Sequence, residues 1–552
     1  MRKLRVGVVD FITKSPNRSM WSRVMHANMA GIMPQVIATW CEQEGHDVDY
    51  FIYTGFENLV TDVPKDVDIV FISSFTQSAI QAYALSAKYR KHGVVTVLGG
   101  PHARCYPEDA VKYFDYVLGL TDKEICRDVL QDCSHYSPIG QHLAAKSQPT
   151  TLPGVTERWK YIAKALEKAT SLFRVVPMIG SLGCPYSCSF CIDASEAYQP
   201  LEFEALKEDL RFVRTKIKRP LISWYDPNFG VRFDDYMNVI EEAAPKNSID
   251  FIAESSLSLL SEPHLKRLQE NGFKALLPGI ESWFDMGNKS KTGSKQGIEK
   301  VKAVSDHINL ILSYVPYMQT NFVVGLDSDN GAESYELTKR FVDMAPAAFP
   351  AYPLITAFGR AAPLNLEYQK ENRILAFPFH FLNNNHASNV IPKNYSWPEF
   401  YDLIIDLARY SYSWRAIYNR FRTTTSTIPR WMNFMRAIST EGSGRIKFYK
   451  NIRRMLDEDR KFRDFFEQET TVIPDFYINM MKKDLGPLWE YLPDRAYYHD
   501  PYAYLKSETA KKQNGHAHKE PSDNSIIIDE TATDIPLEIR AGEPVVVRTA
   551  SS

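Results

Sequence analysis

Between residues 172 and 360, short apolar runs alternate with amphipathic helical stretches, and this alternation limits the possible folds more than any other feature of the chain. Repeated strand–helix units build parallel sheets, because each helix returns the chain to the same edge. Helices are expected over 203–217 and 257–271. The six expected strands cover 174–180, 220–225, 249–254, 274–280, 319–325 and 353–358. Six such units predict a partial (β/α)6 barrel, an open relative of the eightfold TIM barrel.

Residues 1–145 alternate in the same way and predict an open, doubly wound, Rossmann-like α/β domain. The expected strands are 4–9, 47–53, 67–73 and 93–98, with helices over 29–44, 77–91 and 107–113. Ligands of such sheets bind beyond the carboxyl ends of the strands. Neither GxGxxG nor GxxxxGK[ST] occurs, so neither common phosphate-binding loop is indicated.

The rest of the chain divides by composition. Residues 146–171 are expected to form a linker, 361–505 a mainly helical region, and 506–552, polar and without periodicity, a disordered tail. The net charge of −2 argues against a dedicated nucleic-acid binder. No run reaches membrane-spanning length, the N-terminus lacks a secretory signal, and seven cysteines are an odd number. A protein of fold class α/β in the reducing cytoplasm is therefore expected.

Three of the seven cysteines fall within the short segment GCPYSCSFC. Cys184, Cys188 and Cys191 have the spacing CxxxCxxC. After Cys191, the next Cys or His in the chain is His264. A structural zinc ion takes four protein ligands, which this segment does not supply. A cubic iron–sulfur cluster held by three thiolates instead keeps one iron open for another ligand. The spacing predicts such a three-thiolate metal centre.

This segment closely resembles the signature of the radical S-adenosylmethionine (SAM) superfamily. The resemblance implies that Cys184, Cys188 and Cys191 hold a [4Fe–4S] cluster whose open iron binds the amino and carboxylate groups of SAM. Electron transfer would then cleave SAM to a 5′-deoxyadenosyl radical. Phe190 matches the aromatic residue before the third cysteine, near the adenine. An electron donor such as flavodoxin or ferredoxin is the expected partner.

Polar residues follow several of the expected barrel strands, at the ends where such barrels gather their chemistry. The resemblance places the segment 226–229 against the SAM amino group, and it places the backbone at Gly325 close to the adenine. Any one of these residues is equally well an ordinary loop residue or helix cap. The expected SAM contacts are Phe190, Asp226, Asn228, Glu254, Glu281, Ser282 and Gly325.

Residues 1–145 look like the cobalamin-binding domain that precedes many radical SAM barrels. The match lies in MAGIMPQVIATWCEQEGHDV (29–48), SSFT (73–76), GGPHARCYPEDA (99–110) and DYVLGLTDKEI (115–125). The DxHxxG motif, which supplies a histidine to cobalt, is absent, because FITKSPNRSM follows Asp10. The alternative is a vacant scaffold domain, with His102 as a loop cap. The expected cobalamin contacts are Ser73, Ser74, Thr76, Gly99, Gly100 and His102.

The segment 409–454 carries eleven Arg or Lys residues and a single acidic residue, Glu441, interleaved with aromatic residues. Three interpretations stand. Arginine stems can cover the core while their heads stay in water. The segment can form a surface for anionic lipids and a peripheral membrane contact. It can also bind an anionic substrate or nucleic acid.

The leading hypothesis is a cobalamin-dependent radical SAM methyltransferase that acts on an unactivated carbon of a small-molecule or lipid substrate. A carbon without an acidic proton cannot be methylated by a nucleophilic route, so a radical must form in a site closed to water. The alternatives are a cyclisation or rearrangement with the same cofactors, SAM cleavage beside a vacant N-terminal domain, and a non-catalytic iron–sulfur or zinc protein.

Overall fold

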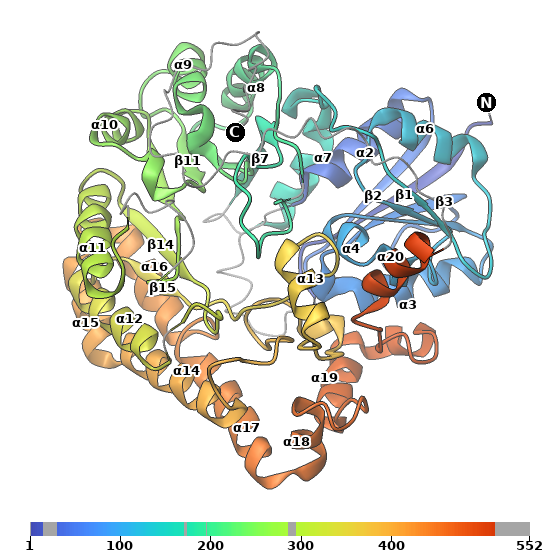
Figure 1. Ribbon diagram of the computed structural model, residues 1–552. Helices are drawn as coiled ribbons and strands as arrows, with labels where there is room; N and C mark the ends of the chain where they lie inside the picture. The colour runs from blue at the N-terminus through green and yellow to red at the C-terminus, as the bar shows by residue number, and fades with distance from the viewer. Residues whose placement is uncertain are drawn as a thin grey trace, which may run out of the picture.

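The computed structural model describes residues 2–14, 30–169, 174–194, 196–284, 294–329 and 331–513. Two parallel sheets stand side by side, the first from the N-terminal part of the chain and the second from its middle (Figure 1). A mainly helical C-terminal region adjoins both, as expected. Among the described residues, no helix is both long enough and apolar enough to cross a bilayer.

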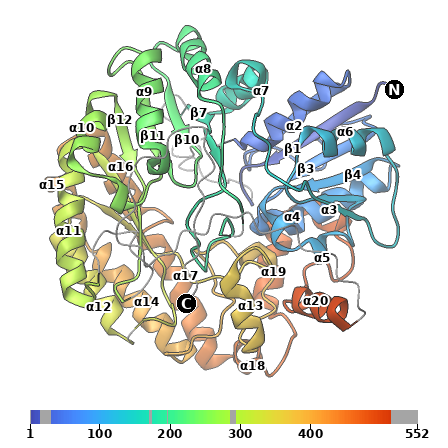
Figure 2. The ribbon, with the colours of Figure 1, turned by 45° about the horizontal axis from the view of Figure 1, so that its top comes forward.

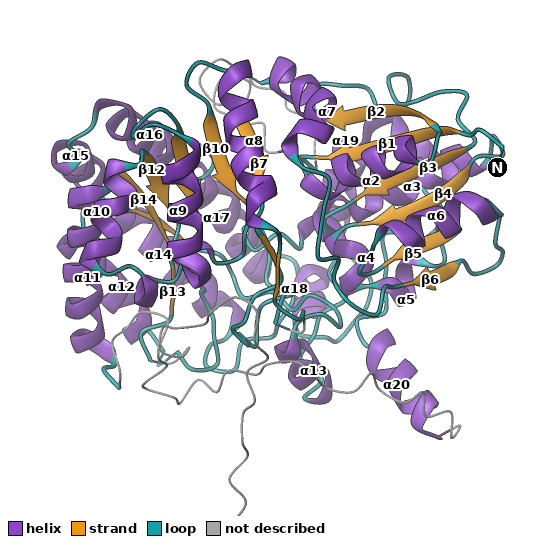
Figure 3. Ribbon diagram, turned by 90° about the horizontal axis from the view of Figure 1, so that it is seen from above, coloured by secondary structure: helices purple, strands orange, loops and turns teal. Residues whose placement is uncertain are grey.

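The N-terminal sheet confirms the predicted doubly wound domain. Its strands are β1 (Arg5–Phe11), β2 (Asp47–Tyr53), β3 (Ile69–Ser73), β4 (Val95–Gly99), β5 (Tyr116–Leu118) and β6 (Gln141–Leu143). They are all parallel, in the order β2-β1-β3-β4-β5-β6 (Figure 3). Two separate hydrophobic clusters pack on this domain's sheet. One contains the buried residues of α2 (Ile32–Gln43) and α6 (Lys123–Asp132), and the other contains those of α3 (Ala79–Arg90). Helices therefore cover both faces of the sheet.

The helix expected over 107–113 is the shorter α5 (Pro107–Ala110), and a second short helix that was not expected, α4 (Pro101–Cys105), precedes it. Each begins with a proline, whose fixed φ suits a first helical turn and whose missing N–H costs nothing there. The strands β5 and β6 and the helix α6 were not expected from the sequence.

The second sheet is the predicted open barrel. Its strands are β7 (Val175–Met178), β10 (Leu221–Trp224), β11 (Asp250–Ala253), β12 (Phe273–Leu276), β13 (Gly279–Glu281), β14 (Tyr317–Phe322) and β15 (Phe349–Ala351). Parallel pairing runs from β7 through β10, β11 and β12 to β14, and β14 also pairs with β13 and β15. β12 and β13 share the fourth position, so six positions form an arc. Helices α8 (Phe203–Lys216), α9 (Phe233–Ala243), α10 (Glu262–Glu270), α11 (Gly297–Tyr314) and α12 (Glu333–Met344) line its outside (Figure 2).

The prediction of a sixth strand over 353–358 is wrong. The strand is β15, and the expected run contributes only one isolated bridge, between Val324 and Leu354. Leu354, Ile355 and Ala357 are buried in irregular backbone. A short buried apolar run has no periodicity that separates a strand from a buried loop.

The C-terminal region consists of α13 (Pro363–Lys370), α14 (Trp397–Ser411), α15 (Trp414–Thr423), α16 (Thr427–Ile438), α17 (Ser443–Glu458), α18 (Arg460–Phe466), α19 (Asp475–Leu485) and α20 (Ala503–Gln513). Helix α20 extends into the segment expected to be disordered from residue 506, and residues 514–552 lie outside the described part of the chain. The expected linker, 146–171, contains the helix α7 (Val155–Lys168).

The carboxyl edges of the two sheets face each other. The α4–α5 segment, which follows β4, meets the segment that follows β15: the Tyr106 hydroxyl donates to the Ala357 carbonyl at 3.1 Å, and the Arg360 amide donates to the Cys105 carbonyl at 2.9 Å. An ion pair at 3.1 Å between Arg360 and Glu108 adds to this contact. The two ends at which such sheets bind ligands are therefore brought together.

Gly359 sits at the tightest point of this contact. Its φ is +53°, and a Cβ there would lie 1.8 Å from the carbonyl oxygen of Cys105. We expect Gly359→Ala to lower the free energy of unfolding by about 3 kcal/mol, from strain and overlap together. Gly331→Ala is the matched control, because φ is +52° there and a Cβ would meet nothing within 4 Å. It should cost about 1 kcal/mol in the same denaturant titration. Equal losses in the two variants would show that the contact is not tight.

Candidate functional site

The three cysteines lie on one loop after β7, at the mouth of the barrel. The two-stranded pair β8 (Ser181–Leu182) and β9 (Gln199–Pro200) closes the base of this loop. Cys188 is buried, whereas Cys184 and Cys191 are partly exposed, and none of the chain's cysteines forms a disulfide. The amide of Asp193 donates a hydrogen bond to the sulfur of Cys191 at 3.4 Å. Amide donors to a sulfur are one means by which proteins tune an iron–sulfur potential.

The donor set on this loop fits a cubic iron–sulfur cluster. Three thiols on one short loop match the three-cysteine ligation that keeps one iron open. Within the described ranges, no group of three or more His, Cys, Asp or Glu side chains is arranged for binding a metal ion. The assignment of Cys184, Cys188 and Cys191 to a cluster therefore rests on their spacing and their shared loop.

Arg104 connects the Rossmann-like domain to the cysteine loop. It stands at the end of α4, and its guanidinium donates to the Ile192 carbonyl at 2.8 Å and to Asp193 at 3.1 Å. It also pairs with Glu196 at 2.9 Å. The Arg104 side chain is 22% exposed, so these contacts are shielded from bulk water. A single cation thus fixes the backbone and both carboxylates that follow Cys191.

Asp226 and Asn228 lie just beyond β10, as expected for SAM contacts, but their side chains are bonded inside the protein. Asp226 accepts from the Ser181 hydroxyl at 2.6 Å, from the Gly180 amide at 3.2 Å and from Tyr236. Burial raises the pKa of its carboxyl. Asn228 exchanges two hydrogen bonds with Ser256, at 2.7 and 3.1 Å. Both residues hold strand ends in register, and neither side chain is presented to the barrel mouth.

Glu254 is the predicted SAM contact with the most exposed side chain. It follows β11 and keeps exposed surface although barrel atoms surround it. This crowding raises the pKa of its carboxyl, and the negative charge of Asp193 raises it further. The interaction places Glu254 close to the cysteine loop. It can accept hydrogen bonds from a bound polar molecule.

Glu281 ends β13 and Ser282 follows it, as expected. Glu281 has φ +65°, a left-handed conformation that is uncommon outside glycine, and its carboxylate folds back over Gly279. Ser282 is buried, and its hydroxyl accepts from the Phe284 amide at 3.2 Å. They line a cavity of about 20 Å³, which has room for about one water molecule.

Gly325 and Phe190 both lie close to the protein segment that follows β14. Gly325 has φ +91°, and a Cβ there would lie 2.6 Å from the ring of Phe400 on α14. A helix side chain therefore fills the space on the side of Gly325 where a Cβ would stand. Phe190 packs against a core cluster that includes Leu326 and Ile355. The aromatic residue of the cysteine loop therefore lies beside the segment that follows β14, where Leu326 is the neighbour of Gly325 in the chain.

The predicted cobalamin edge has an open part and a filled part. A Cβ on Gly99 would meet nothing within 4 Å, and Ser73 beside it is partly exposed. Gly100 has φ +90° and close contact with Ser73 and Ser74. Ser74 and Thr76 are buried, and the Ser74 hydroxyl donates to the Phe75 carbonyl at 2.8 Å. Gly99 and Ser73 are thus the predicted contacts that fit a large flat ligand.

His102 does not face an open surface, contrary to the expectation that it could face a corrin. It is fully buried, with Nε2 2.7 Å from the Tyr83 hydroxyl and its ring 4.7 Å from the ring of Phe379. Burial, together with the nearby His499, lowers its pKa to about 3. The C-terminal region therefore covers this histidine, which serves as a neutral core residue.

Asp10 and Tyr225 lie near each other where the two sheets face each other. Asp10 ends β1 and accepts from the Gly31 amide at 2.8 Å and from the Tyr50 hydroxyl at 3.1 Å, and burial raises its pKa to about 6. Tyr225 follows β10; burial raises the pKa of its hydroxyl, and the charge of Asp10 raises it further. The Tyr225 hydroxyl has no hydrogen-bond partner among the described residues. It is a buried donor at the interface, which a bound group could satisfy.

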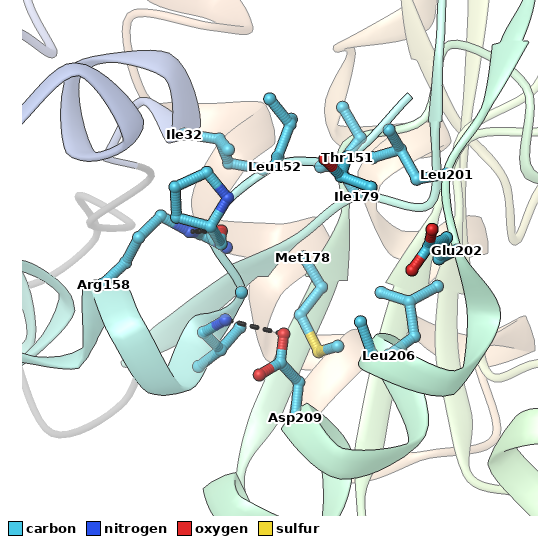
Figure 4. A pocket seen from close by; sticks show the side chains of 14 residues that line it. Ile32, Thr151, Leu152, Arg158, Met178, Ile179, Leu201, Glu202, Leu206 and Asp209 are labelled. Atoms are coloured by element: carbon cyan, nitrogen blue, oxygen red, sulfur yellow. Dashed lines mark hydrogen bonds between the residues drawn. The ribbon is translucent and has the colours of Figure 1, made fainter. Parts of the chain in front are cut away.

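A cavity of about 150 Å³ lies beside this interface, between α2, α7, β7 and α8 (Figure 4). Its polar wall is Arg158, which donates to the Gln35 side chain at 2.7 Å, and Asp209, which accepts from the Val155 and Thr156 amides at 2.6 and 3.1 Å. Asp209 of the barrel thereby caps α7 of the linker. This cavity was not predicted, since its walls come from three separate parts of the chain.

Comparison with known proteins finds two significant curated relatives, both from Chlorobaculum tepidum. The chain is 23% identical to bacteriochlorophyllide d C-12(1)-methyltransferase over 319 residues, which is 56% of this chain and 68% of that protein. It is 25% identical to bacteriochlorophyllide d C-8(2)-methyltransferase over 313 residues, which is 53% of this chain and 66% of that protein. No protein-family model matches the chain.

Among solved structures, the chain is similar to the radical SAM methyltransferase TsrM from Kitasatospora setae, with cobalamin and a [4Fe–4S] cluster bound. The identity is 13%, with 67% of this chain and 75% of that one covered and a TM-score of 0.48. The cobalamin-dependent radical SAM enzyme OxsB, with aqua-cobalamin and SAM bound, matches with 13% identity over 95% of this chain and 82% of that one, at a TM-score of 0.49. The chain is therefore similar in sequence to two methyltransferases over more than half of its length, and it combines the CxxxCxxC loop with an open six-position barrel behind a Rossmann-like domain.

Proposed function

We propose that this chain cleaves SAM at a [4Fe–4S] cluster and transfers a methyl group, with cobalamin, to an unactivated carbon of a small-molecule or lipid substrate. The observation that carries the proposal is the contact between Arg104, at the carboxyl edge of the Rossmann-like sheet, and the loop that bears the three cysteines. Two sites that cooperate in one reaction must be held within reach of each other.

When bound, the cluster would supply the electron that cleaves SAM, and cobalamin would carry the methyl group. The protein's own residues prepare the two sites. Cys184, Cys188 and Cys191 are the thiols available to the cluster. Glu254 offers a carboxylate to a polar group bound at the barrel mouth, and the open space at Gly99 leaves room for a large ligand. The contacts between the two carboxyl edges would help to shield the space between them from water, as a radical reaction requires.

The two relatives support methyl transfer in preference to a rearrangement, because both are methyltransferases. Their names describe a tetrapyrrole, so a bacteriochlorophyllide-type macrocycle is the first acceptor to try. We expect a one-electron donor such as flavodoxin or ferredoxin to reduce the cluster.

The test is anaerobic turnover of the full chain, reconstituted with iron, sulfide and hydroxocobalamin and supplied with SAM, a reductant and a candidate acceptor. We expect 5′-deoxyadenosine to form and the acceptor to gain about 14 Da. A product of unchanged mass would favour a cyclisation or rearrangement. SAM cleavage that is independent of added cobalamin would favour a vacant N-terminal scaffold. An absence of SAM cleavage after reduction would overturn the proposal.

A further inference from the structure

The helices α15 and α16 carry large apolar side chains on the surface of the protein. Four of these side chains are more than half exposed: Trp414 at 73%, Tyr418 at 63%, Ile428 at 73% and Trp431 at 52%. No other pair of neighbouring helices in the described ranges exposes so many large hydrophobic residues. Side chains of this size are seldom left in water in such a group, so the surface suggests a binding role.

The exposed side chains form one continuous surface. Trp414 and Tyr418 are four residues apart on α15, and Ile428 and Trp431 are three apart on α16, so each pair shares a helix face. The rings of Phe421 and Trp431 join the two helices, with centroids 5.2 Å apart. We call the surface formed by residues 414–438 of α15 and α16 the aromatic face.

The aromatic face is positively charged. Residues 414–438 contain five arginines and no aspartate or glutamate. Two of the arginines are internal: Arg420 donates to the Ala348 carbonyl at 3.1 Å, and Arg436 bonds to Tyr317 and Glu441. Arg415 pairs with Asp343 of α12 at 3.2 Å and is still 57% exposed. Arg422 is exposed, and Arg430 lies over the ring of Phe421 at 5.4 Å. Positive charge therefore borders the apolar strip on both helices.

We propose that the aromatic face docks the protein on a membrane surface that contains anionic lipids. Tryptophan and tyrosine favour the boundary between headgroups and acyl chains, and arginine places its charge among the phosphates while its stem covers apolar surface. Transfer of an exposed isoleucine beside them from water into the acyl region is favourable. An acidic protein or a nucleic acid would satisfy the arginines without burying Ile428, so a lipid surface accounts for more of this face.

The position of the aromatic face indicates an anchor and not a substrate entrance. Arg436 and Arg420 tie the two helices to the amino ends of β14 and β15, through Tyr317 and the carbonyl of Ala348. The cysteine loop follows the carboxyl end of β7. Because the strands are parallel, this loop lies at the opposite end of the barrel strands from α15 and α16. Figures 1 and 3 place α15 and α16 at the end of the molecule away from the Rossmann-like domain. The barrel mouth would stay open when the protein is docked.

The proposal is tested by co-sedimentation of the full chain with phosphatidylcholine vesicles, with and without phosphatidylglycerol, in the absence of iron and cobalamin. We expect binding to the anionic vesicles, weakened by salt. The double variant W414A/W431A should bind about tenfold more weakly or worse, as should R415E/R422E. Val472→Ala is the matched control, because Val472 is 72% exposed before α19, away from the aromatic face, and this variant should bind like the natural protein.

Three results would overturn the proposal. The full chain could stay in solution with anionic vesicles, the double variant could sediment as well as the natural protein, or the control could lose as much binding as the double variant. An unchanged thermal midpoint in each variant shows that folding is intact, as expected for exposed side chains. A face that binds an acidic protein or a nucleic acid would give no sedimentation with vesicles. The test needs no turnover, so its failure and a failure of the proposed function are separate results.

Discussion

Replacing Cys184, Cys188 or Cys191 by alanine, one at a time, will reduce bound iron and lower SAM cleavage at least about a hundredfold. Each thiolate supplies one of three protein ligands, and no other Cys or His side chain of the described chain lies within the cysteine loop to replace it. Two thiolates cannot hold three irons of a cube in place. Iron and sulfide analysis after anaerobic reconstitution, followed by 5′-deoxyadenosine measurement, gives the result directly.

The matched control is Cys133→Ala. This thiol is also partly exposed, but it directly follows α6 in the Rossmann-like domain, as the C-cap of that helix. The control variant should keep its iron and its activity. A loop-cysteine variant with the iron content and the SAM cleavage of the natural protein would contradict the assignment of the three thiols.

Arg104→Ala should lower SAM cleavage about 10- to 100-fold while the iron content stays near that of the natural protein. The change removes the cation that fixes the Ile192 carbonyl, Asp193 and Glu196, so the loop after Cys191 loses its link to the Rossmann-like domain. It also leaves carboxylates beside the cluster site without a counter-charge. Since added negative charge disfavours reduction, the cluster potential should become more negative. An anaerobic redox titration followed by electron paramagnetic resonance measures this shift.

Two variants frame the Arg104 result. Arg104→Lys keeps the positive charge but cannot reproduce the forked set of donors of a guanidinium. The cluster potential of this variant should therefore be closer to that of the natural protein than its rate of SAM cleavage is. Arg211→Ala removes an exposed arginine of α8 that pairs with Glu208 at 2.5 Å, and it should change neither quantity. Natural turnover together with a natural potential in Arg104→Ala would show that the link between the domains has no part in the reaction.

The sequence predicted both sheets because their strands are apolar, β-branched runs that are separated by amphipathic helices. It did not predict β5 and β6, which have three residues each and carry too short a pattern. It placed the sixth barrel strand at a buried loop, since 353–358 is as apolar as a strand. Length and apolar character thus predicted the architecture but not every element boundary.

The candidate site shows a second limit of sequence reasoning. The sequence placed Asp226, Asn228 and Glu254 at the ends of barrel strands, and they lie there. It could not show which way each side chain points, and only Glu254 keeps exposed surface. Arg104 was missed because its partners stand about ninety residues away in the chain. One signal was available: Arg104 is a charged residue between two small apolar residues, Ala103 and Cys105, which are both buried, shortly after a strand. Such a charge needs a partner inside the protein.

The most direct test of the whole account is a metal analysis. The full chain would be reconstituted anaerobically with iron, sulfide and hydroxocobalamin, desalted, and examined by absorption spectroscopy and by elemental analysis. A cluster on the cysteine loop and a corrinoid at the Rossmann-like edge predict about four irons and one cobalt per chain. Four irons without retained cobalt would contradict corrinoid-dependent methyl transfer, and a chain that retains neither metal would contradict the account as a whole.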